Sequence, residues 1–249
     1  MINIKMNHKQ KKYLISFQDL GLIDYKEAWD YQEKCLKDLI IEKEKLKKSI
    51  KVNDIPQKQV ILFCEHPHVY TLGKSGDEHN LLINKDFLNR INASFFKINR
   101  GGDITYHGPG QIVGYPIIAL DSMAIKIREY VWMIEESIIR LLADYGIKGG
   151  RLERATGVWL NTKRSGKIKK ICAIGVRVSN HVTMHGFALN INTDLNYFRY
   201  INPCGFVDKE ITSLSNELGK DQNLDEVKKK LKFHIAQLFN IDWNVVANT

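Results

Sequence analysis

The sequence predicts an α/β protein of the α+β type, a single domain in which a mixed β-sheet is flanked by helices. Apolar, strand-like segments occur both in consecutive pairs and separated by helical patterns, which favours a mixed sheet over a regular doubly wound fold. The chain has 249 residues and is 44% hydrophobic, enough for one sizeable core, and no stretch is polar enough to be a linker. We therefore expect one domain over residues 1–249.

The first quarter of the chain predicts a strand, a long helix and a buried strand. The strand is expected at Tyr13–Phe17. Asp24 and Glu27 form an N-cap and capping-box pair, and the apolar residues that follow at helical spacing predict a helix that runs to about Lys48. QVILFCEH at 59–66 then has the composition of a buried strand.

The middle of the chain alternates strands with one strongly amphipathic helix. SFFKINR at 94–100 and the end of RGGDITYHGPGQIVGYPIIAL at 100–120 are strand-like. Apolar residues recur every three or four positions over Ile127–Tyr145, so we expect a helix that packs on the sheet. TGVWL at 156–160 and KKICAIGVRV at 169–178 flank a polar loop with one glycine, which predicts a long hairpin.

The C-terminal part predicts one more strand followed by helices. HGFALNIN at 185–192 is strand-like, and short helical pieces are expected near Leu195–Tyr200 and Ile211–Leu218. The final helix starts after the N-cap Asn223 and turns its apolar residues inward.

Charge and cysteine content restrict the partners and the compartment. Lys plus Arg number 37 against 28 Asp plus Glu, which gives a net charge of +9. A basic surface favours acidic partners, either nucleic acid or an acidic carrier protein, and charge alone does not choose between them. Four scattered cysteines predict free thiols. No apolar run is long enough to cross a bilayer and no signal peptide is recognisable, so we expect a cytoplasmic protein without membrane contact.

Three motifs do not meet the requirements of the sites they suggest. LGKSG at 72–76 ends like a phosphate-binding loop, but His68 occupies the position of the required first glycine. GPGQIVG at 108–114 precedes a strand instead of opening a helix, unlike a dinucleotide-binding loop. CEHPH at 64–68 offers alternating metal-ligand types, but no second Cys/His cluster is present, so we expect no metal site.

Cys204 lies in INPCGF between Pro203 and Gly205, where the chain must turn. Such a turn can present a thiol beside free backbone amides that would bind an oxyanion. An unperturbed thiol has a pKa of about 8.5, so it needs a partner to ionise at neutral pH. From composition alone Cys204 is either a nucleophile or an inert loop residue.

Lys170, His185 and His107 are the candidate partners of this thiol. Lys170 opens an apolar strand, where its cation would favour the thiolate, although it could equally be a surface lysine. The segment RGGDITYHGPGQ at 100–111 crowds polar groups among four glycines and reads either as a ligand loop or as a tight structural turn.

Three separated segments together resemble the octanoyltransferases of lipoate biosynthesis, the lipoyl(octanoyl) transferases related to lipoate and biotin protein ligases. They are RGGDITYHGPGQIVGYPII, KKICAIGVRVSNHVTMHGFALNINTDL and INPCGF, and EHPHVYTLGKSG fits an early segment of the same family. The resemblance extends over about residues 60–216 and implies a biotin/lipoyl ligase-like fold. It also implies transfer of an octanoyl group from octanoyl-acyl carrier protein to a lysine of a lipoyl domain, in 2-oxoacid dehydrogenases or the glycine cleavage H protein.

The resemblance carries over individual residues. Cys204 matches the catalytic cysteine and Lys170 the lysine that assists it. The segments that contact substrate in the family match Arg100, Gly101, Gly102, Asp103, Ile104, Thr105, Tyr106 and His107; Ala173, Ile174 and Gly175; and Gly186, Phe187 and Ala188. His185 is a further pocket candidate, and no cofactor, metal or nucleic acid is implied.

Two departures and two rival functions accompany this interpretation. Asp103 stands where many members carry Gln, and Cys172 adds a second thiol near Lys170. The rivals are an ATP-dependent lipoate or biotin protein ligase, which would not need Cys204, and a non-catalytic module that binds the acyl carrier protein.

Overall fold

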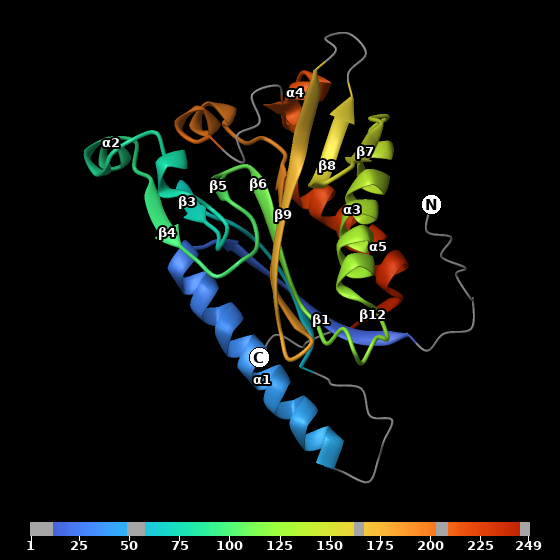
Figure 1. Ribbon diagram of the computed structural model, residues 1–249. Coiled ribbons are helices and arrows are strands. Elements are labelled where there is room, and N and C mark those ends of the chain that lie inside the picture. Colours follow the sequence, from blue (N-terminus) through green and yellow to red (C-terminus); the bar gives the residue numbers. More distant parts are fainter. Residues whose placement is uncertain (1–11, 49–57, 162–166, 203–208, 245–249) are drawn as a thin grey trace.

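A long mixed sheet forms the centre of the protein (Figure 1). The computed structural model describes residues 12–48, 58–161, 167–202 and 209–244. The strands are β1 (Tyr13–Leu22), β2 (Val60–Glu65), β3 (Val69–Leu72), β4 (Ser94–Lys97), β5 (Ile104–His107), β6 (Gln111–Ile117), β7 (Gly149–Leu152), β8 (Ala155–Asn161), β9 (Ile168–Ser179), β10 (Val182–Asn190), β11 (Lys209–Ile211) and β12 (Ile241–Asn244). The helices are α1 (Tyr25–Lys48), α2 (Lys85–Arg90), α3 (Ile127–Ala143), α4 (Leu214–Leu218) and α5 (Leu224–Phe239), with 3-10 helices η1 (Glu78–Asn80) and η2 (Leu195–Tyr200).

The strand order confirms the predicted mixed sheet. The large sheet runs β12-β1-β2-β6-β10-β9-β8-β7, and β11 pairs with β9 outside this path. β1 is parallel to both β12 and β2, and β11 is parallel to β9, whereas the β2–β6–β10–β9–β8–β7 pairs are antiparallel. The first and last described strands are neighbours, with Tyr13 opposite Ile241.

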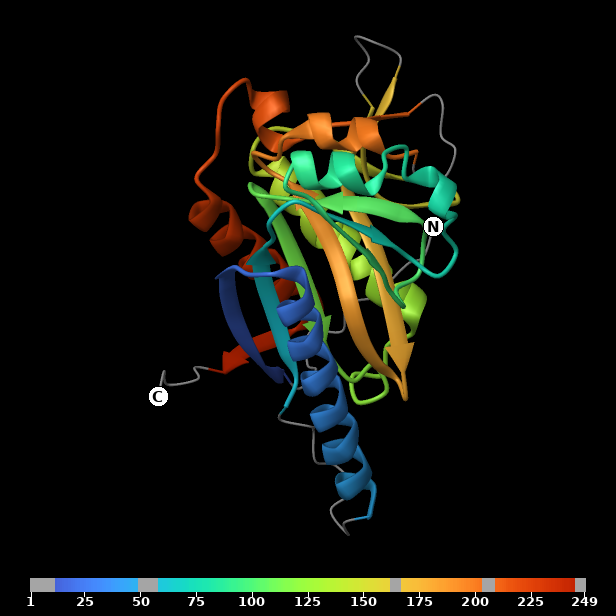
Figure 2. The same ribbon diagram turned by 90° about the vertical axis from the view of Figure 1, so that its left-hand side faces the viewer.

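Helices cover both faces of this sheet (Figures 1 and 2). α3 and α5 lie on one face, where Ile134 and Ile138 belong to the same buried cluster as Phe63 and Phe187 of the sheet. α1 lies across the other face and buries Leu36 in a second cluster. The far end of α1 extends beyond the strands, which fits its highly charged sequence.

A small second sheet, ordered β4-β3-β5, lies beside the large one. Its core is aromatic: Tyr70 and Tyr106 are fully buried and pack with Tyr197 of η2. The Tyr106 and Tyr197 rings stack with centroids 5.0 Å apart, and His68 stacks on Tyr197 at 4.0 Å. This cluster fixes η2, which leads into the segment containing Cys204.

Most predicted elements are confirmed, including the helix that ends at Lys48 and the hairpin of β8 and β9. The Asp24 carboxylate accepts a hydrogen bond from the Lys26 amide at 2.7 Å, and Asn223 caps α5 as predicted. The helix expected over Ile211–Leu218 is wrong at its start. Ile211 is still in β11, because it pairs with β9, and α4 begins only after its N-cap Ser213.

Candidate active site

A cavity of about 570 Å³ opens where the glycine-rich segment 100–107 meets β8, β9, β10 and β11. Its walls include Tyr25 of α1, the end of η2 and the beginning of β11. Of the residues predicted to bind substrate, the cavity is lined by Arg100, Gly101, Gly102, Asp103, Ile104, Thr105, His107, Ala173, Ile174, Gly175, Gly186, Phe187 and Ala188. The candidate residues Lys170 and His185 line it as well. Four chain segments that are far apart in sequence therefore meet at one hollow.

Tyr106 is the predicted contact that does not line the cavity. It is fully buried in the small sheet, and its hydroxyl is 2.7 Å from Nδ1 of His68. In a strand, neighbouring side chains point to opposite faces, so Thr105 and His107 line the cavity while Tyr106 belongs to the aromatic core. Tyr106 thus packs in the core of the small sheet, on the side of β5 that faces away from the cavity.

Cys204 lies outside the described residues, but both residues that flank its segment are placed. Asn202 and Lys209 line the cavity. On the far side, β11 pairs with β9 in parallel register, so Ile211 lies opposite Lys170. On the near side, the Asn202 amide donates to the carbonyl oxygen of Asn80 at 2.8 Å. The described residues on either side of Cys204, Asn202 and Lys209, therefore both lie at this cavity, and Lys209 belongs to the strand that pairs with the strand of Lys170.

Arg100 is fixed in the cavity wall by the small sheet. Only 7% of its surface is exposed. Its Nη2 donates to the carbonyl oxygen and to Oγ1 of Thr71, at 2.6 and 3.0 Å, and its Nη1 donates to the carbonyl oxygen of Gly101 at 3.1 Å. These three hydrogen bonds from the two terminal nitrogens hold the guanidinium in the wall and tie the glycine-rich segment to β3.

The glycines of the site allow backbones to approach one another. The amide of Gly101 donates to the carbonyl oxygen of Val176 at 3.0 Å, so that amide is engaged by β9. A Cβ on Gly175 would lie 2.8 Å from the carbonyl oxygen of Gly101, and a Cβ on Gly186 would lie 2.1 Å from that of Gly114. Gly102 has a φ of +89°, which other residues rarely adopt. Close packing between main chains accounts for these glycines without a ligand.

Both candidate histidines are uncharged at neutral pH. Burial lowers the pKa of His107 to about 3, with a further contribution from the His66 side chain, and burial followed by the Arg100 charge lowers the pKa of His185 to about 3. Nδ1 of His107 is 2.8 Å from Oε1 of Gln111, and Nε2 of His185 is 2.8 Å from Oδ1 of Asn99. Neither imidazole can supply the cation that a thiolate needs, which leaves Lys170 as the candidate.

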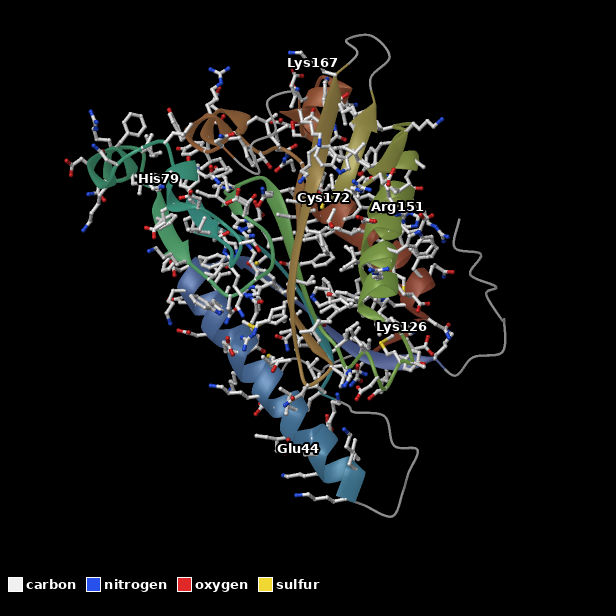
Figure 3. All side chains as sticks on the ribbon, in the orientation of Figure 1. Glu44, His79, Lys126, Arg151, Lys167 and Cys172 are labelled. Atoms are coloured by element: carbon white, nitrogen blue, oxygen red, sulfur yellow. The ribbon has the colours of Figure 1, made fainter. Side chains whose placement is uncertain are left out.

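Cys172 is a poor nucleophile despite its place near Lys170. It is fully buried in the sheet (Figure 3), and its Sγ donates to the carbonyl oxygen of Ala173 at 3.4 Å. Burial raises the pKa of the Cys172 thiol, and the nearby Lys170 charge only partly opposes this. A buried neutral thiol reacts slowly.

The segment LGKSG at 72–76, which does not meet the phosphate-loop pattern, holds the glycine-rich segment in place. The amides of Lys74 and Ser75 donate to the carbonyl oxygens of Arg100 and Gly102, at 3.0 and 3.3 Å. Those amides hold the glycine-rich segment and are not presented to a phosphate. The CEHPH residues also separate: Cys64 and Tyr115 contact Nε2 of His66, at 3.4 and 2.7 Å, while His68 pairs with Tyr106.

Sequence reasoning missed several residues of the cavity wall, chiefly Tyr25, Tyr115, Trp159 and Asn190. Trp159 could have been found, because the predicted hairpin pairs its strand with that of Lys170. Within the described part of the chain, no helix combines the length and apolar character needed to cross a membrane. The same residues contain no group of three or more metal-ligating side chains.

Comparison with known proteins identifies the family. The model of the lipoyl protein ligase A/B catalytic domain matches residues 24–236. An octanoyltransferase of Christiangramia forsetii is 52% identical over 229 residues, covering 92% of this chain and 97% of that protein. An octanoyltransferase of Bacteroides thetaiotaomicron is 51% identical over 222 residues, covering 89% and 94%.

The chain belongs to the octanoyltransferase family. The resemblance seen in the three sequence segments is thereby confirmed, and the chain is an acyltransferase. Solved structures confirm the fold of this family. The bipartite lipoate protein ligase of Thermoplasma acidophilum has a TM-score of 0.67 at 15% identity, covering 93% of this chain and 86% of the ligase. Lipoate-protein ligase A bound with ATP has a TM-score of 0.64 at 15% identity, covering 94% and 88%. Transferases and ligases share this fold, so the fold does not distinguish them. The relatives with about 50% sequence identity place this chain with the octanoyltransferases.

Proposed function

We propose that this protein carries out octanoyl transfer in lipoate biosynthesis through a thioester on Cys204, with Lys170 as the proton carrier. The donor would be octanoyl-acyl carrier protein and the acceptor a lysine of a lipoyl domain, in 2-oxoacid dehydrogenases or the glycine cleavage H protein. The observation that carries this proposal is the parallel pairing of β11 with β9, because β11 begins at Lys209, five residues after Cys204 in the sequence, and Ile211 of β11 lies opposite Lys170. The pairing of β1 with β12, the first and last described strands, supports one domain over residues 1–249.

The first step forms the acyl-enzyme. The Cys204 thiolate attacks the carbonyl carbon of the carrier thioester, and the bond from that carbon to the carrier sulfur breaks. The departing carrier thiolate takes a proton from the Lys170 ammonium, which leaves a neutral amine. A thioester is already activated, so this step consumes no ATP.

The second step returns both groups to their starting states. The acceptor lysine attacks the octanoyl-Cys204 thioester as a neutral amine, and its excess proton passes to neutral Lys170. An amide forms, the carbon–sulfur bond breaks, and Cys204 leaves as a thiolate beside the restored ammonium. One lysine thus donates a proton in the first transfer and accepts one in the second.

The walls of the cavity suit an octanoyl chain. Apolar side chains that line it include Val113, Val131, Ile174, Val176 and Phe187. Each methylene removed from water contributes about 0.8 kcal/mol to binding. The volume of about 570 Å³ is within the range of small-molecule pockets.

Intact-mass spectrometry tests the proposal. The protein is incubated with octanoyl carrier protein and no acceptor, and we expect one octanoyl adduct, which Cys204→Ser abolishes. Cys35→Ser is the matched control, because Cys35 lies on α1 and outside the cavity lining. Absence of an adduct on the wild type, or an undiminished adduct on Cys204→Ser, would defeat the proposal. Adenylate formation from free octanoate and ATP would favour the ligase rival.

A further inference from the structure

The indole ring of Trp159 lies against the side chain of Lys170. The two residues are opposite each other in the antiparallel pair of β8 and β9. Nζ of Lys170 is 4.5 Å from the centre of the indole ring, and Nζ of Lys209 is 5.3 Å from the same ring. All three residues line the cavity, and Trp159 is only 4% exposed. Two cations therefore lie close to one indole ring at the cavity.

The ring is held in place by the hairpin that carries it. The indole Nε1 donates to the carbonyl oxygen of Ala155 at 2.9 Å. The register between β8 and β9 shifts at Trp159: Val158 is opposite Cys172, and the next residue, Trp159, is opposite Lys170. This irregularity brings the ring and the ammonium together, because an unshifted register would place Trp159 opposite Ile171.

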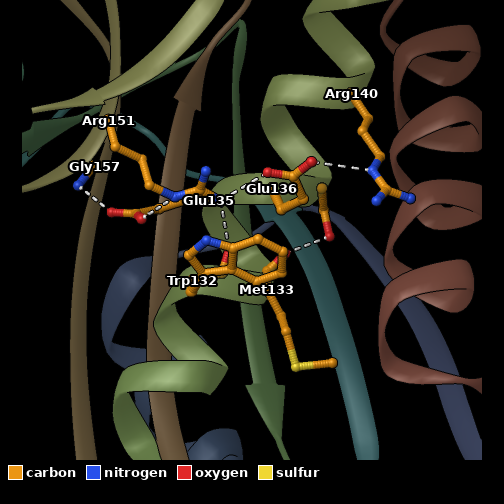
Figure 4. A network of polar contacts seen from close by, with 8 residues as sticks. Trp132, Met133, Glu135, Glu136, Arg140, Arg151 and Gly157 are labelled. Carbon is orange, nitrogen blue, oxygen red and sulfur yellow. Dashed lines mark hydrogen bonds and ion pairs between the residues drawn. The ribbon is translucent and has the colours of Figure 1, made fainter. Parts of the chain in front are cut away.

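An ion pair between Glu135 of α3 and Arg151 of β7 supports the shifted register (Figure 4). Gly157, just before the shift, has a φ of +127°, and a Cβ there would lie 2.5 Å from the carbonyl oxygen of Cys172. Its amide donates to Oε1 of Glu135 at 3.0 Å. The other oxygen of Glu135 accepts from Nε of Arg151 at 2.9 Å, and Arg151 also bonds Glu136. Glu135 is mostly buried, so this arrangement is rigid.

We propose that Trp159 is a positioning residue for Lys170. The indole ring of Trp159 holds the side chain of Lys170 at the cavity and stabilises its charged, ammonium form. An aromatic face attracts a cation and has no comparable attraction for a neutral amine. The ring thus favours the resting state, in which Lys170 is an ammonium at the cavity. After the first acyl transfer it favours the return of a proton to Lys170. The consequence for Cys204 rests on the proposed function, whereas the contact of Trp159 with Lys170 does not.

Within the described residues, several other charged or titratable groups lie on the elements around Lys170. Lys209 and Glu210 are on β11, Lys169 and Cys172 are on its own strand, Glu135 is on α3, Glu217 of α4 pairs with Lys169, and Arg154 lines the cavity. Substituting the uncharged Trp159 removes none of these charges, although Lys209 also loses its contact with the ring. A change in the titration of Lys170 in such a variant therefore reports the ring.

The decisive measurement is the pH titration of Lys170 by NMR, with ¹³C at Cε of lysine and Lys170→Met to assign the signal. Loss of the ring in Trp159→Leu is expected to lower the proton affinity of Lys170 two- to fivefold, or about half a pH unit. Trp159→Tyr retains an aromatic face and is expected to stay close to the wild type. Trp243→Leu is the matched control, because Trp243 lies under Lys232 at 5.0 Å on the distant edge strand β12.

A second measurement follows the proposed consequence for the nucleophile. The rate of Cys204 alkylation by iodoacetamide is recorded against pH, and Trp159→Leu is expected to shift the midpoint upward, whereas Trp243→Leu does not. An unchanged Lys170 titration in a folded Trp159→Leu variant would overturn the inference and reduce Trp159 to a packing residue. If the Lys170 titration shifts but the wild type forms no octanoyl adduct, the inference stands and the proposed function fails.

Discussion

Ile211 lies opposite Lys170 in the parallel pair of β11 and β9, and the amide of Thr212 donates to the carbonyl oxygen of Lys170 at 2.9 Å. A three-residue strand has little stability of its own, so its register is set by the neighbouring strand and by the α4 helix that follows. This pairing places β11, which begins three residues after the segment INPCGF, beside the strand that carries Lys170. The proposed action of Lys170 on Cys204 rests on this pairing and on the short stretch of sequence between Cys204 and β11.

Replacing Lys170 with Met should reduce the rate of Cys204 acylation about tenfold or more, because loss of a nearby cation raises the pKa of the thiol by at least one unit. Pre-steady-state acylation by octanoyl carrier protein measures this rate, and circular dichroism verifies the fold. Lys169→Met is the matched control: Lys169 pairs with Glu217 at 3.1 Å and does not line the cavity. Near-normal acylation in Lys170→Met would make Lys170 a structural residue.

Labelling of the native protein should distinguish the thiols. Cys64 and Cys172 are fully buried and burial raises the pKa of both, so neither should react with iodoacetamide before unfolding. We expect Cys204 to be labelled first, with peptide mass spectrometry as the readout. The proximity of Cys172 to Lys170 then does not confuse the assignment. Rapid labelling of Cys172 in the folded protein would contradict its burial.

The long elements were predictable because they carry strong periodicity. The helix over Ile127–Tyr145 and the hairpin of β8 and β9 bury apolar faces that can be read directly from residue spacing. The short strands β3, β5, β7, β11 and β12 were missed. A strand of three or four residues shows no clear alternation, and its existence depends on a partner distant in sequence.

The candidate site was predictable to a similar extent. The predicted residues make up about half of the cavity lining, because the segments around Arg100–His107, Lys170–Gly175 and His185–Ala188 each form part of its wall. Motifs could not reveal that Tyr106 faces the aromatic core or that Trp159 lies against Lys170. They also could not reveal that the amide of Gly101 donates a hydrogen bond to the carbonyl oxygen of Val176. Each of these contacts depends on the register between paired strands. That register is set by contacts between segments distant in sequence and cannot be read from either segment alone.

Gly186→Ala should destabilise the protein by about 1–3 kcal/mol, because the added methyl group meets backbone and the strands must separate. A Cβ there would lie 2.1 Å from the carbonyl oxygen of Gly114 and 2.8 Å from Cδ of Pro116. Gly150→Ala is the matched control, since a Cβ at Gly150 meets nothing within 4 Å. Urea denaturation gives the free energy of unfolding. Equal stability of the two variants would show that β10 and β6 can move apart freely.

Stability should fall on acidification below about pH 6.5, because three buried histidines resist protonation in the folded state. Burial lowers the pKa of His66 to about 4 and the pKa values of His107 and His185 to about 3. The unfolded chain, with an ordinary histidine pKa of about 6.5, takes up these protons first. A group whose folded pKa is lowered contributes stability above its unfolded pKa, and this contribution is lost as the pH falls toward the folded value. Each histidine then adds a slope of about 1.4 kcal/mol per pH unit.

The variant His107→Gln isolates one of these contributions. Its free energy of unfolding, measured by urea denaturation between pH 7.5 and 4.5, should depend less steeply on pH than that of the wild type, by about 1.4 kcal/mol per pH unit at the acidic end. His181→Asn is the control, since His181 is exposed and its φ of +63° is tolerated by asparagine. An identical slope in the wild type and His107→Gln would mean that His107 is protonated in the folded protein, contrary to its burial against Gln111 and Thr71.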